Sequence, residues 1–250
     1  LLKPYLVMGM GVVAISFAAI FIRLAEAPSL VVAAARLTIA SMILLPLSWH
    51  GIRQEMHTVC SRDLLLFCLS GVFLALHFAV WIASLSYTSV AASVVLVTTN
   101  PIFVALASFF FLHEAIGRLK ALGIGCSMVG GVVIGVGGMG GGGHALYGDF
   151  LALLGALLMT SYLVAGRRLR QRYSLMVYIS IVYGVAAVIL LAICLATGAS
   201  FYPYPGRTYL MFVLLALIPQ LIGHSSFNWA LRHVSASFVA VAILGEPVGA

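Results

Sequence analysis

The chain has 250 residues, of which 63% are hydrophobic and only 8% are charged, and its formal net charge is +7. Together with a mean hydropathy of +1.18, this composition excludes a water-soluble domain and is typical of a protein that lives in a lipid bilayer. Strand-like alternation is absent, so helices rather than a barrel are expected to satisfy the backbone in lipid.

Nine apolar runs follow one another along the chain, and each is expected to be a membrane helix of roughly 20 residues. The connections between them are short, so no soluble domain is expected, and the first run lacks the cleavage pattern of a signal peptide. The four cysteines stand singly and are expected to be small buried hydrophobes. The runs lie near 4–22, 30–48, 64–85, 90–112, 119–138, 148–166, 174–197 and 208–231, with an incomplete ninth from 234.

The positions of Lys and Arg predict the orientation, because positive residues in short loops stay on the cytoplasmic side. With the N-terminus inside, the cytoplasmic loops hold ten of these residues and the opposite side holds two, Arg23 and Arg207. We therefore expect an integral protein of a bacterial inner membrane with a cytoplasmic N-terminus. The positive charge then lies beside anionic lipid headgroups, and no nucleic-acid partner is expected.

Polar side chains inside the apolar runs are the candidate functional residues, since an unpaired polar group in hydrocarbon is costly. Arg36, in the second run, is expected either to make a structural ion pair or carbonyl contacts, or to bind a substrate carboxylate. His77 and Trp81, in the third run, are four residues apart and share a helix face. That face is expected to line a pore and bind substrate, with an interhelical hydrogen bond of His77 and plain packing of Trp81 as the alternatives.

The fourth run contains an unusual polar stretch, Thr98-Thr99-Asn100-Pro101. Pro101 removes a backbone donor and disfavours helix at Asn100, so a break is predicted here. In lipid such a break is tolerated only where protein or a water-filled cavity satisfies the freed groups. Thr98, Thr99 and Asn100 are therefore expected to point inward, toward a substrate. Threonine hydroxyls that bond back to their own helix are the alternative.

A glycine-rich stretch separates the two halves of the chain. Its GxGxxG spacing follows a membrane helix rather than a strand, so it is expected to be a flexible connector and not a phosphate loop. The predicted division is a first unit over 1–138, a connector over 139–147 and a second unit over 148–250. No metal or cofactor site is expected, because the His and Cys residues of the longest loop lack a fourth ligand.

The eighth run repeats the polar spacing of the third, with Gln220, His224 and Asn228 four residues apart. His224 and Asn228 are expected to bind substrate, with a satisfied interhelical hydrogen bond as the alternative for the histidine. Tyr162 and its counterpart Phe17 are expected either to face the same cavity or to pack between helices.

The pair Glu246-Pro247 repeats the helix break of the fourth run with an ionisable group. A carboxylate inside an apolar span is costly and is usually functional, so Glu246 is a candidate for protonation coupled to transport. Pairing with an arginine to close the bundle is the alternative.

An internal repeat relates the two halves. WIASLSYTSVAASVVLVTTNP (81–101) and FNWALRHVSASFVAVAILGEP (227–247) correspond without a gap at a shift of 146 residues. A unit of five spans is odd, so the second copy must enter the membrane in the opposite sense, which is the architecture of secondary transporters with a midplane site. Because Ala250 pairs with Val104, we expect a ten-helix, 5+5 inverted-repeat bundle of which this chain ends within the ninth helix.

These paired segments resemble the EamA family of the drug/metabolite transporter superfamily, and most closely its YddG-like exporters of aromatic amino acids and amphiphilic cations. The resemblance lies in LSYTSVAASVVLVTTNPIFVALASFFFLHE and ALRHVSASFVAVAILGEPV, with AAARLTIA around Arg36 and YGDFLALLGALLMTSYLVAGRR opening the second half. It implies a ten-helix carrier with both termini cytoplasmic, which moves small metabolites, often outward, by alternating access.

The sequence therefore predicts a secondary-type transporter rather than an enzyme, which exports or exchanges small amphiphilic metabolites, above all aromatic or hydrophobic amino acids. A pocket with aromatic walls and few fixed charges suits such solutes. Protons are the coupling ion if Glu246, His77 or His224 titrates in the transport range. The alternatives are a receptor or scaffold that binds without transport, and a carrier for a drug cation or a nucleotide-type metabolite. Monomer and homodimer both stay open.

Overall fold

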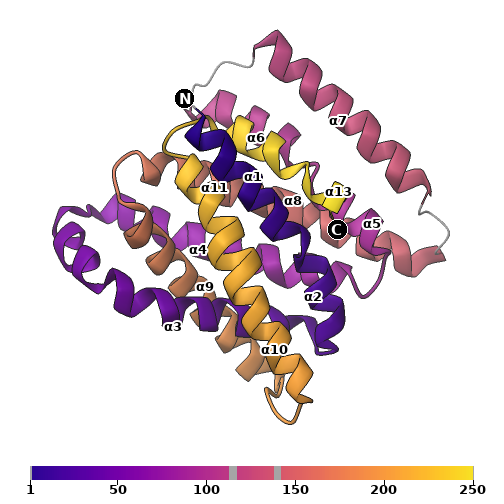
Figure 1. The fold of residues 1–250 in the computed structure, drawn as a ribbon, viewed down its shortest axis with the longest axis horizontal. Coiled ribbons are helices and arrows are strands. Elements are labelled where there is room, and N and C mark those ends of the chain that lie inside the picture. Colours follow the sequence, from indigo (N-terminus) through magenta and orange to yellow (C-terminus); the bar gives the residue numbers. More distant parts are fainter. Residues whose placement is uncertain (1, 113–116, 138–141, 250) are drawn as a thin grey trace.

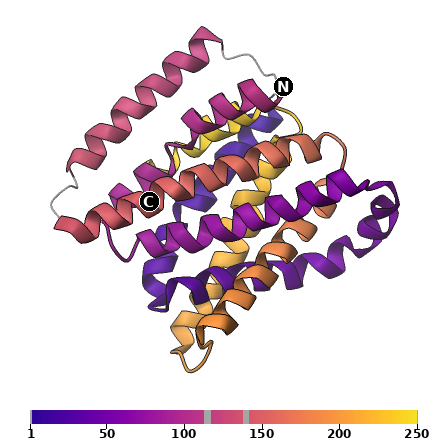
Figure 2. The ribbon, with the colours of Figure 1, turned by 180° about the vertical axis from the view of Figure 1, so that it is seen from behind.

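The computed structural model describes residues 2–112, 117–137 and 142–249, and these residues are helical, with no strand among them. The helices pack as a bundle, with α7 along one edge in both views (Figures 1 and 2). In chain order the elements are α1 (Lys3–Ser16), α2 (Ala18–Ala25), α3 (Ser29–Glu55), η1 (Met56–Thr58), α4 (Ser61–Ser84), α5 (Val90–Val97), α6 (Asn100–Ala107), η2 (Ser108–Leu112), α7 (Arg118–Gly137), α8 (Gly142–Arg170), α9 (Leu175–Thr197), α10 (Gly206–Leu215), η3 (Ala216–His224), α11 (Ser225–Ala230), α12 (Ala236–Ile243) and α13 (Glu246–Gly249).

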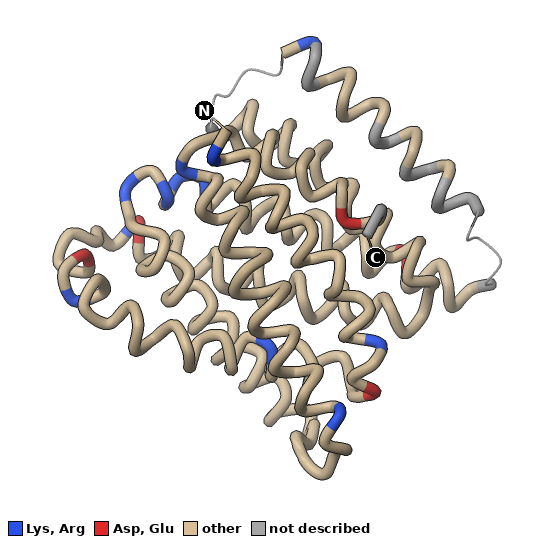
Figure 3. The backbone as a smooth tube through the Cα atoms, viewed as in Figure 1, with Lys and Arg blue, Asp and Glu red and all other residues tan. Residues whose placement is uncertain are grey.

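Seven of the described helical segments are long and apolar enough to cross a membrane. They agree with seven of the nine runs expected from the sequence; α7 and the α12–α13 segment are outside this set. The seven are Lys3–Ala25, Ser29–Thr58, Ser61–Ser84, Val90–Phe111, Gly143–Arg170, Leu175–Thr197 and Gly206–Ala230. Most of the Lys and Arg residues lie toward the end of the bundle that holds the N-terminus (Figure 3).

The connector expected at 139–147 is only partly within the described residues. Residues 142–147 form the first turns of α8 rather than a flexible link. Ala145 and Leu146 are good helix formers that continue directly into the apolar run, so the helix begins earlier than the glycines suggested.

The predicted break at Pro101 separates α5 from α6, with Thr98 and Thr99 as the two turn residues. Proline has no N–H to continue the helical hydrogen bonds. The two threonine hydroxyls satisfy carbonyls of the preceding turn: Thr98 Oγ1 donates to the Val94 oxygen at 2.8 Å, and Thr99 Oγ1 donates to the Leu96 oxygen at 2.7 Å. The same two oxygens also accept from the Thr98 and Thr99 amides, so the hydroxyls reinforce the end of α5 rather than replace the bond that Pro101 cannot make.

A second break of the same form separates α12 from α13, directly before Glu246 and Pro247. The two breaks begin and end 146 residues apart, as do α5 and α12 themselves. The preceding caps also match, because the Ser89 side chain accepts from the Ala92 amide and the Ser235 side chain accepts from the Phe238 amide. Serine is a favoured N-cap, so the same local chemistry starts both helices.

The packing partners of the elements follow this repeat. α4 packs on α8, and its counterpart segment α10–η3–α11 packs on α1 and α2, which are the counterparts of α8. α3 packs on its own counterpart α9, and α6 packs on α12. The two broken segments therefore meet near the middle of the bundle, where each half contributes one.

Gly71 marks a close approach of α4 to α9. A Cβ on Gly71 would lie 2.6 Å from the Val185 Cβ and 3.1 Å from the Val182 carbonyl oxygen. We expect Gly71→Ala to lower the free energy of unfolding by about 1 kcal/mol or more, because neither neighbour is the free end of a side chain. Thermal unfolding in detergent measures this change. Gly184→Ala on α9, whose Cβ would have nothing within 4 Å, is the control and should be neutral or slightly stabilising; equal effects would contradict the close contact.

Candidate functional site

A cavity lies where the broken helices cross α1, α4, α8 and the η3–α11 segment. The space open to the centre of a water molecule is about 20 Å³, which is room for about one water. Both halves of the chain supply its walls. The lining residues are Ile15, Ala18, His77, Trp81, Val97, Thr98, Asn100, Met159, His224, Phe227, Ile243 and Glu246.

Five of the residues singled out in the sequence as substrate-binding or coupling groups share this cavity. These are His77, Trp81, Asn100, His224 and Glu246. They come from four elements, two in each half of the chain, and all five side chains are at least nine-tenths buried. The helix breaks place Asn100 and Glu246, which correspond in the repeat, at the first residue of α6 and of α13.

Several buried polar atoms of the cavity walls have no hydrogen-bond partner among the described residues. These atoms are Trp81 Nε1, both polar atoms of the Asn100 amide, and His224 Nδ1. A buried donor or acceptor without a partner costs about 1–3 kcal/mol. A ligand with donors and acceptors at matching positions would recover this cost, so the walls are suited to bind a polar group between apolar surfaces.

A layer of rings forms one side of the cavity. His77 and Trp81 are stacked with ring centroids 5.9 Å apart, as the four-residue spacing on α4 predicts. The Nδ1 of His77 donates to the Gly155 carbonyl oxygen at 2.9 Å, so a neutral His77 ring keeps Nε2 as an acceptor. Phe78 contacts His77, Trp81 and His224, with centroid separations of 5.0, 6.4 and 5.2 Å.

Arg36 lies next to this layer but outside the cavity wall. Its guanidinium carbon is 4.1 Å from the centroid of the Phe78 ring, and its Nε donates to the Gln220 Oε1 at 2.8 Å. The residue is completely buried. Among the described residues it makes no ion pair and no hydrogen bond to a backbone carbonyl, and its one acceptor is the side-chain carbonyl oxygen of Gln220.

Tyr162 and Asn228, expected in the cavity wall, instead bond to each other beside it. The Asn228 Nδ2 donates to the hydroxyls of Tyr162 at 2.6 Å and of Tyr183 at 3.1 Å. The Tyr183 and Ser225 hydroxyls are 3.4 Å apart. This cluster ties α8, α9 and α11 together, because the Asn228 amide nitrogen on α11 bonds to tyrosine hydroxyls on the other two helices.

Two other expectations differ from the structure. Thr99 is half-buried and bonded to its own helix, so only Thr98 and Asn100 of the polar stretch reach the cavity. Phe17 is 43% exposed and stacks on Phe21 rather than facing inward, because the break between α1 and α2 turns it outward. Pro101 and Pro247 lie at the two helix breaks, as the sequence predicts, and outside the cavity wall.

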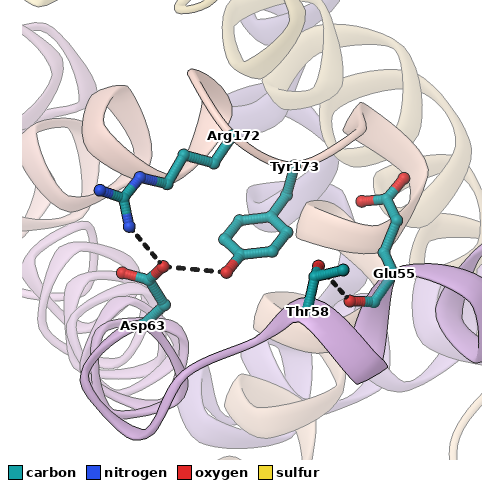
Figure 4. A network of polar contacts seen from close by, with 5 residues as sticks. All are labelled: Glu55, Thr58, Asp63, Arg172 and Tyr173. Atoms are coloured by element: carbon teal, nitrogen blue, oxygen red, sulfur yellow. Dashed lines mark hydrogen bonds and ion pairs between the residues drawn. The ribbon is translucent and has the colours of Figure 1, made fainter.

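A network of polar side chains lies at the bundle end where most Lys and Arg residues gather (Figure 4). The buried Asp63 carboxylate accepts from Arg172 and from the Tyr173 hydroxyl, each at 2.9 Å. Beside it, Glu55 accepts from the Ser174 amide at 2.9 Å. The network joins the end of α3 and the start of α4 to the loop between α8 and α9, and so links the two halves.

Burial and the hydrogen bond to Asp63 raise the pKa of the Tyr173 hydroxyl from 10.0 to about 12. This bond therefore contributes stability that is complete below pH 10 and is lost as the pH rises through about 12. We expect Tyr173→Phe to cost about 1 kcal/mol at pH 8, and this difference from wild type to shrink between pH 10 and 12. Unfolding in detergent across that range measures it.

The control for that experiment is Arg172→Gln. The Arg172 side chain is 60% exposed, so losing its ion pair should cost little. A larger loss from Arg172→Gln than from Tyr173→Phe would contradict the assignment of the buried bond as the stabilising one.

Comparison with known proteins identifies the family. The sequence model of the EamA-like transporter family matches residues 2–136 and again 146–250. The chain belongs to the EamA-like transporter family. It is thus an integral membrane transporter and not a member of an enzyme family. This agrees with the resemblance seen in the sequence.

Two further likenesses accompany the family match. An uncharacterized transporter of Clostridium kluyveri is 24% identical over 221 residues, which cover 84% of this chain and 69% of the relative. A protein of known crystal structure is 19% identical and matches with a TM-score of 0.78 over 99% of this chain and 85% of its own. That structural likeness shows that the two proteins share a fold.

Sequence reasoning missed two groups of residues in the transporter. The apolar residues of the cavity walls, such as Met159 and Phe227, could not be recognised in the sequence, because apolar residues are equally common on helix faces that contact lipid. Phe78 and Tyr183 were also overlooked. Tyr183 could have been found, since a tyrosine in the middle of an apolar span needs a partner for its hydroxyl.

Proposed function

We propose that this EamA-family transporter moves small aromatic or hydrophobic amino acids by alternating access around the cavity described above. The observation that supports this most is the composition of the cavity walls. Aromatic and aliphatic side chains surround a few unpartnered polar atoms and one carboxylate. An amphiphilic solute needs both kinds of surface, whereas a sugar or a phosphate would need more fixed polar groups.

The alternating-access part of the proposal is supported by the repeat. Elements recur at a shift of 146 residues, and each half packs its third span on the first span of the other half: α4 packs on α8, and the α10–η3–α11 segment packs on α1 and α2. Such a relation fits a 5+5 inverted-repeat bundle of ten helices, in which one half rocks against the other around a midplane site. The asymmetry of Lys and Arg supports a cytoplasmic N-terminus in an inner membrane.

The size of the cavity bears on the transport cycle. Space for about one water cannot hold an amino acid, so substrate must enter after the walls separate. The polar network around Asp63 joins the halves at one end of the bundle. We infer that it belongs to the contacts that open and close there, while the crossing of α6 and α12 holds the centre.

The proposal is tested by reconstituting the purified full-length transporter in liposomes. Labelled tryptophan, phenylalanine and leucine are each measured in counterflow, with labelled glucose as a control solute and protein-free liposomes as the blank. Counterflow of at least one amino acid above the blank is expected. Saturable binding of these amino acids without flux would favour a receptor, and flux of other solutes alone would move the search to a different substrate class.

A further inference from the structure

We propose that Arg36 and Gln220 form a carboxylate-binding subsite next to the cavity, separated from it by the Phe78 ring. This inference rests on the proposed function and deepens it, because it selects substrates with a free carboxylate. It assigns to the transporter a preference for amino acids and related acids over their amides and over simple amphiphilic cations.

The first observation is a set of unused donors. Arg36 is 0% exposed, and only its Nε has an acceptor; Nη1 and Nη2 have none among the described residues. The Nε2 of Gln220, whose Oε1 receives the Arg36 bond, is buried and also lacks an acceptor. A guanidinium presents paired N–H groups that match the two oxygens of a carboxylate. A bound carboxylate would therefore supply the acceptors that these buried N–H groups lack.

A second buried arginine shows that this condition is specific to Arg36. Arg170 is also nearly completely buried, with 2% of its surface exposed. Its Nε donates to the Asn228 carbonyl oxygen at 3.1 Å, and its Nη1 donates to the carbonyl oxygen of Tyr173. The fold therefore supplies backbone acceptors to the arginine that holds helices together, and it supplies none to the outer nitrogens of Arg36.

The position of Phe78 connects the unused donors with the cavity. Its ring lies against the Arg36 guanidinium and also contacts His77, Trp81 and His224, which line the cavity. Gln220 reaches the same region from η3, four residues before His224. Phe78 is therefore the side chain that separates the free donors of Arg36 from the cavity, and a ligand that reaches them must displace its ring.

Glu246 does not neutralise Arg36, because no hydrogen bond or ion pair joins the two side chains in the described structure. Glu246 faces the cavity, whereas Arg36 lies behind Phe78. The carboxylate that completes the donors of Arg36 must therefore come from a ligand, and the subsite leaves Glu246 free for the expected role in proton coupling.

The test measures binding by the purified full-length transporter in detergent, so that it does not depend on transport. The probes are indole-3-propionate and indole-3-propionamide, which differ only in the carboxylate. Wild type is expected to bind the acid at least about tenfold more tightly, as befits hydrogen bonds to a charged group. In Arg36→Gln this preference should fall to about one. Arg36→Lys, which keeps the charge and loses the paired donors, should keep part of it.

Arg170→Gln is the matched control, because it removes a buried arginine outside the subsite and should leave the preference unchanged. The subsite would be overturned by any of three results. These are equal binding of acid and amide by wild type, no binding of the acid, and an unchanged preference for the acid in Arg36→Gln. If Arg36→Gln cannot be purified, Gln220→Met should reduce the preference at least threefold, and an unchanged preference there would have the same meaning. If the transporter preferred the acid but moved no amino acid, the subsite would stand and the proposal of amino-acid transport would fall. If it moved amino acids but bound acid and amide equally, the transport proposal would stand and the subsite would fall.

Discussion

Glu246→Gln is expected to reduce proton-driven uptake of amino acid by at least about tenfold. Glu246 is the only acidic residue among the described residues that line the cavity, and glutamine keeps its shape but cannot exchange a proton. Intramembrane carboxylates are costly and commonly serve proton relays. Uptake into liposomes under an imposed pH gradient measures the effect, and counterflow without a gradient should change by less than about threefold.

The control for this prediction is Glu26→Gln, which removes an acidic group at the end of α2, outside the cavity. It should leave both assays unchanged. If Glu246→Gln abolished counterflow together with driven uptake, Glu246 would be a binding or structural group rather than the coupling site. If neither assay changed, the coupling proposal would be wrong.

Asn228→Leu is expected to lower the free energy of unfolding by about 2 kcal/mol or more. The Asn228 amide is the donor to two buried tyrosine hydroxyls, those of Tyr162 and Tyr183. Leucine leaves both oxygens without that donor, and each unsatisfied group costs about 1–3 kcal/mol, less where the hydroxyl finds another partner. Thermal or denaturant unfolding in detergent measures the change.

Tyr183→Phe is the matched variant, because it removes one of the two bonds and its own hydroxyl together. Its cost should be less than half that of Asn228→Leu. A stable Asn228→Leu protein that had lost transport would instead support the role in substrate binding expected from the sequence alone. The two variants therefore separate an anchoring role for Asn228 from a direct one.

The helix breaks and the polar side of the cavity could be predicted because they rest on local chemistry. Proline at position 101 dictates where the hydrogen bonding stops, and the repeat transfers that conclusion to Glu246-Pro247. The spacing of His77 and Trp81 places both on one face of α4, and the structure confirms that they share a wall of the cavity.

Contacts between helices could not be predicted from the same information. Asn228 shares the helical face of His224 by spacing, yet it is engaged by Tyr183 of α9, whose position depends on how the helices pack. The unsatisfied state of Arg36 was equally hidden, because it depends on which acceptors are missing around it. Phe17 and Tyr162 correspond in the repeat but differ in burial, so the relation between the halves is approximate at the level of side chains.

The tightness of the central cavity has an electrical consequence. A cavity with space for about one water cannot hold a continuous file of waters across about 30 Å of hydrocarbon. In this conformation, ions and protons would find no aqueous path through the cavity. In this conformation the cavity itself would therefore not let water-borne ions run down the voltage or the pH difference that the membrane stores.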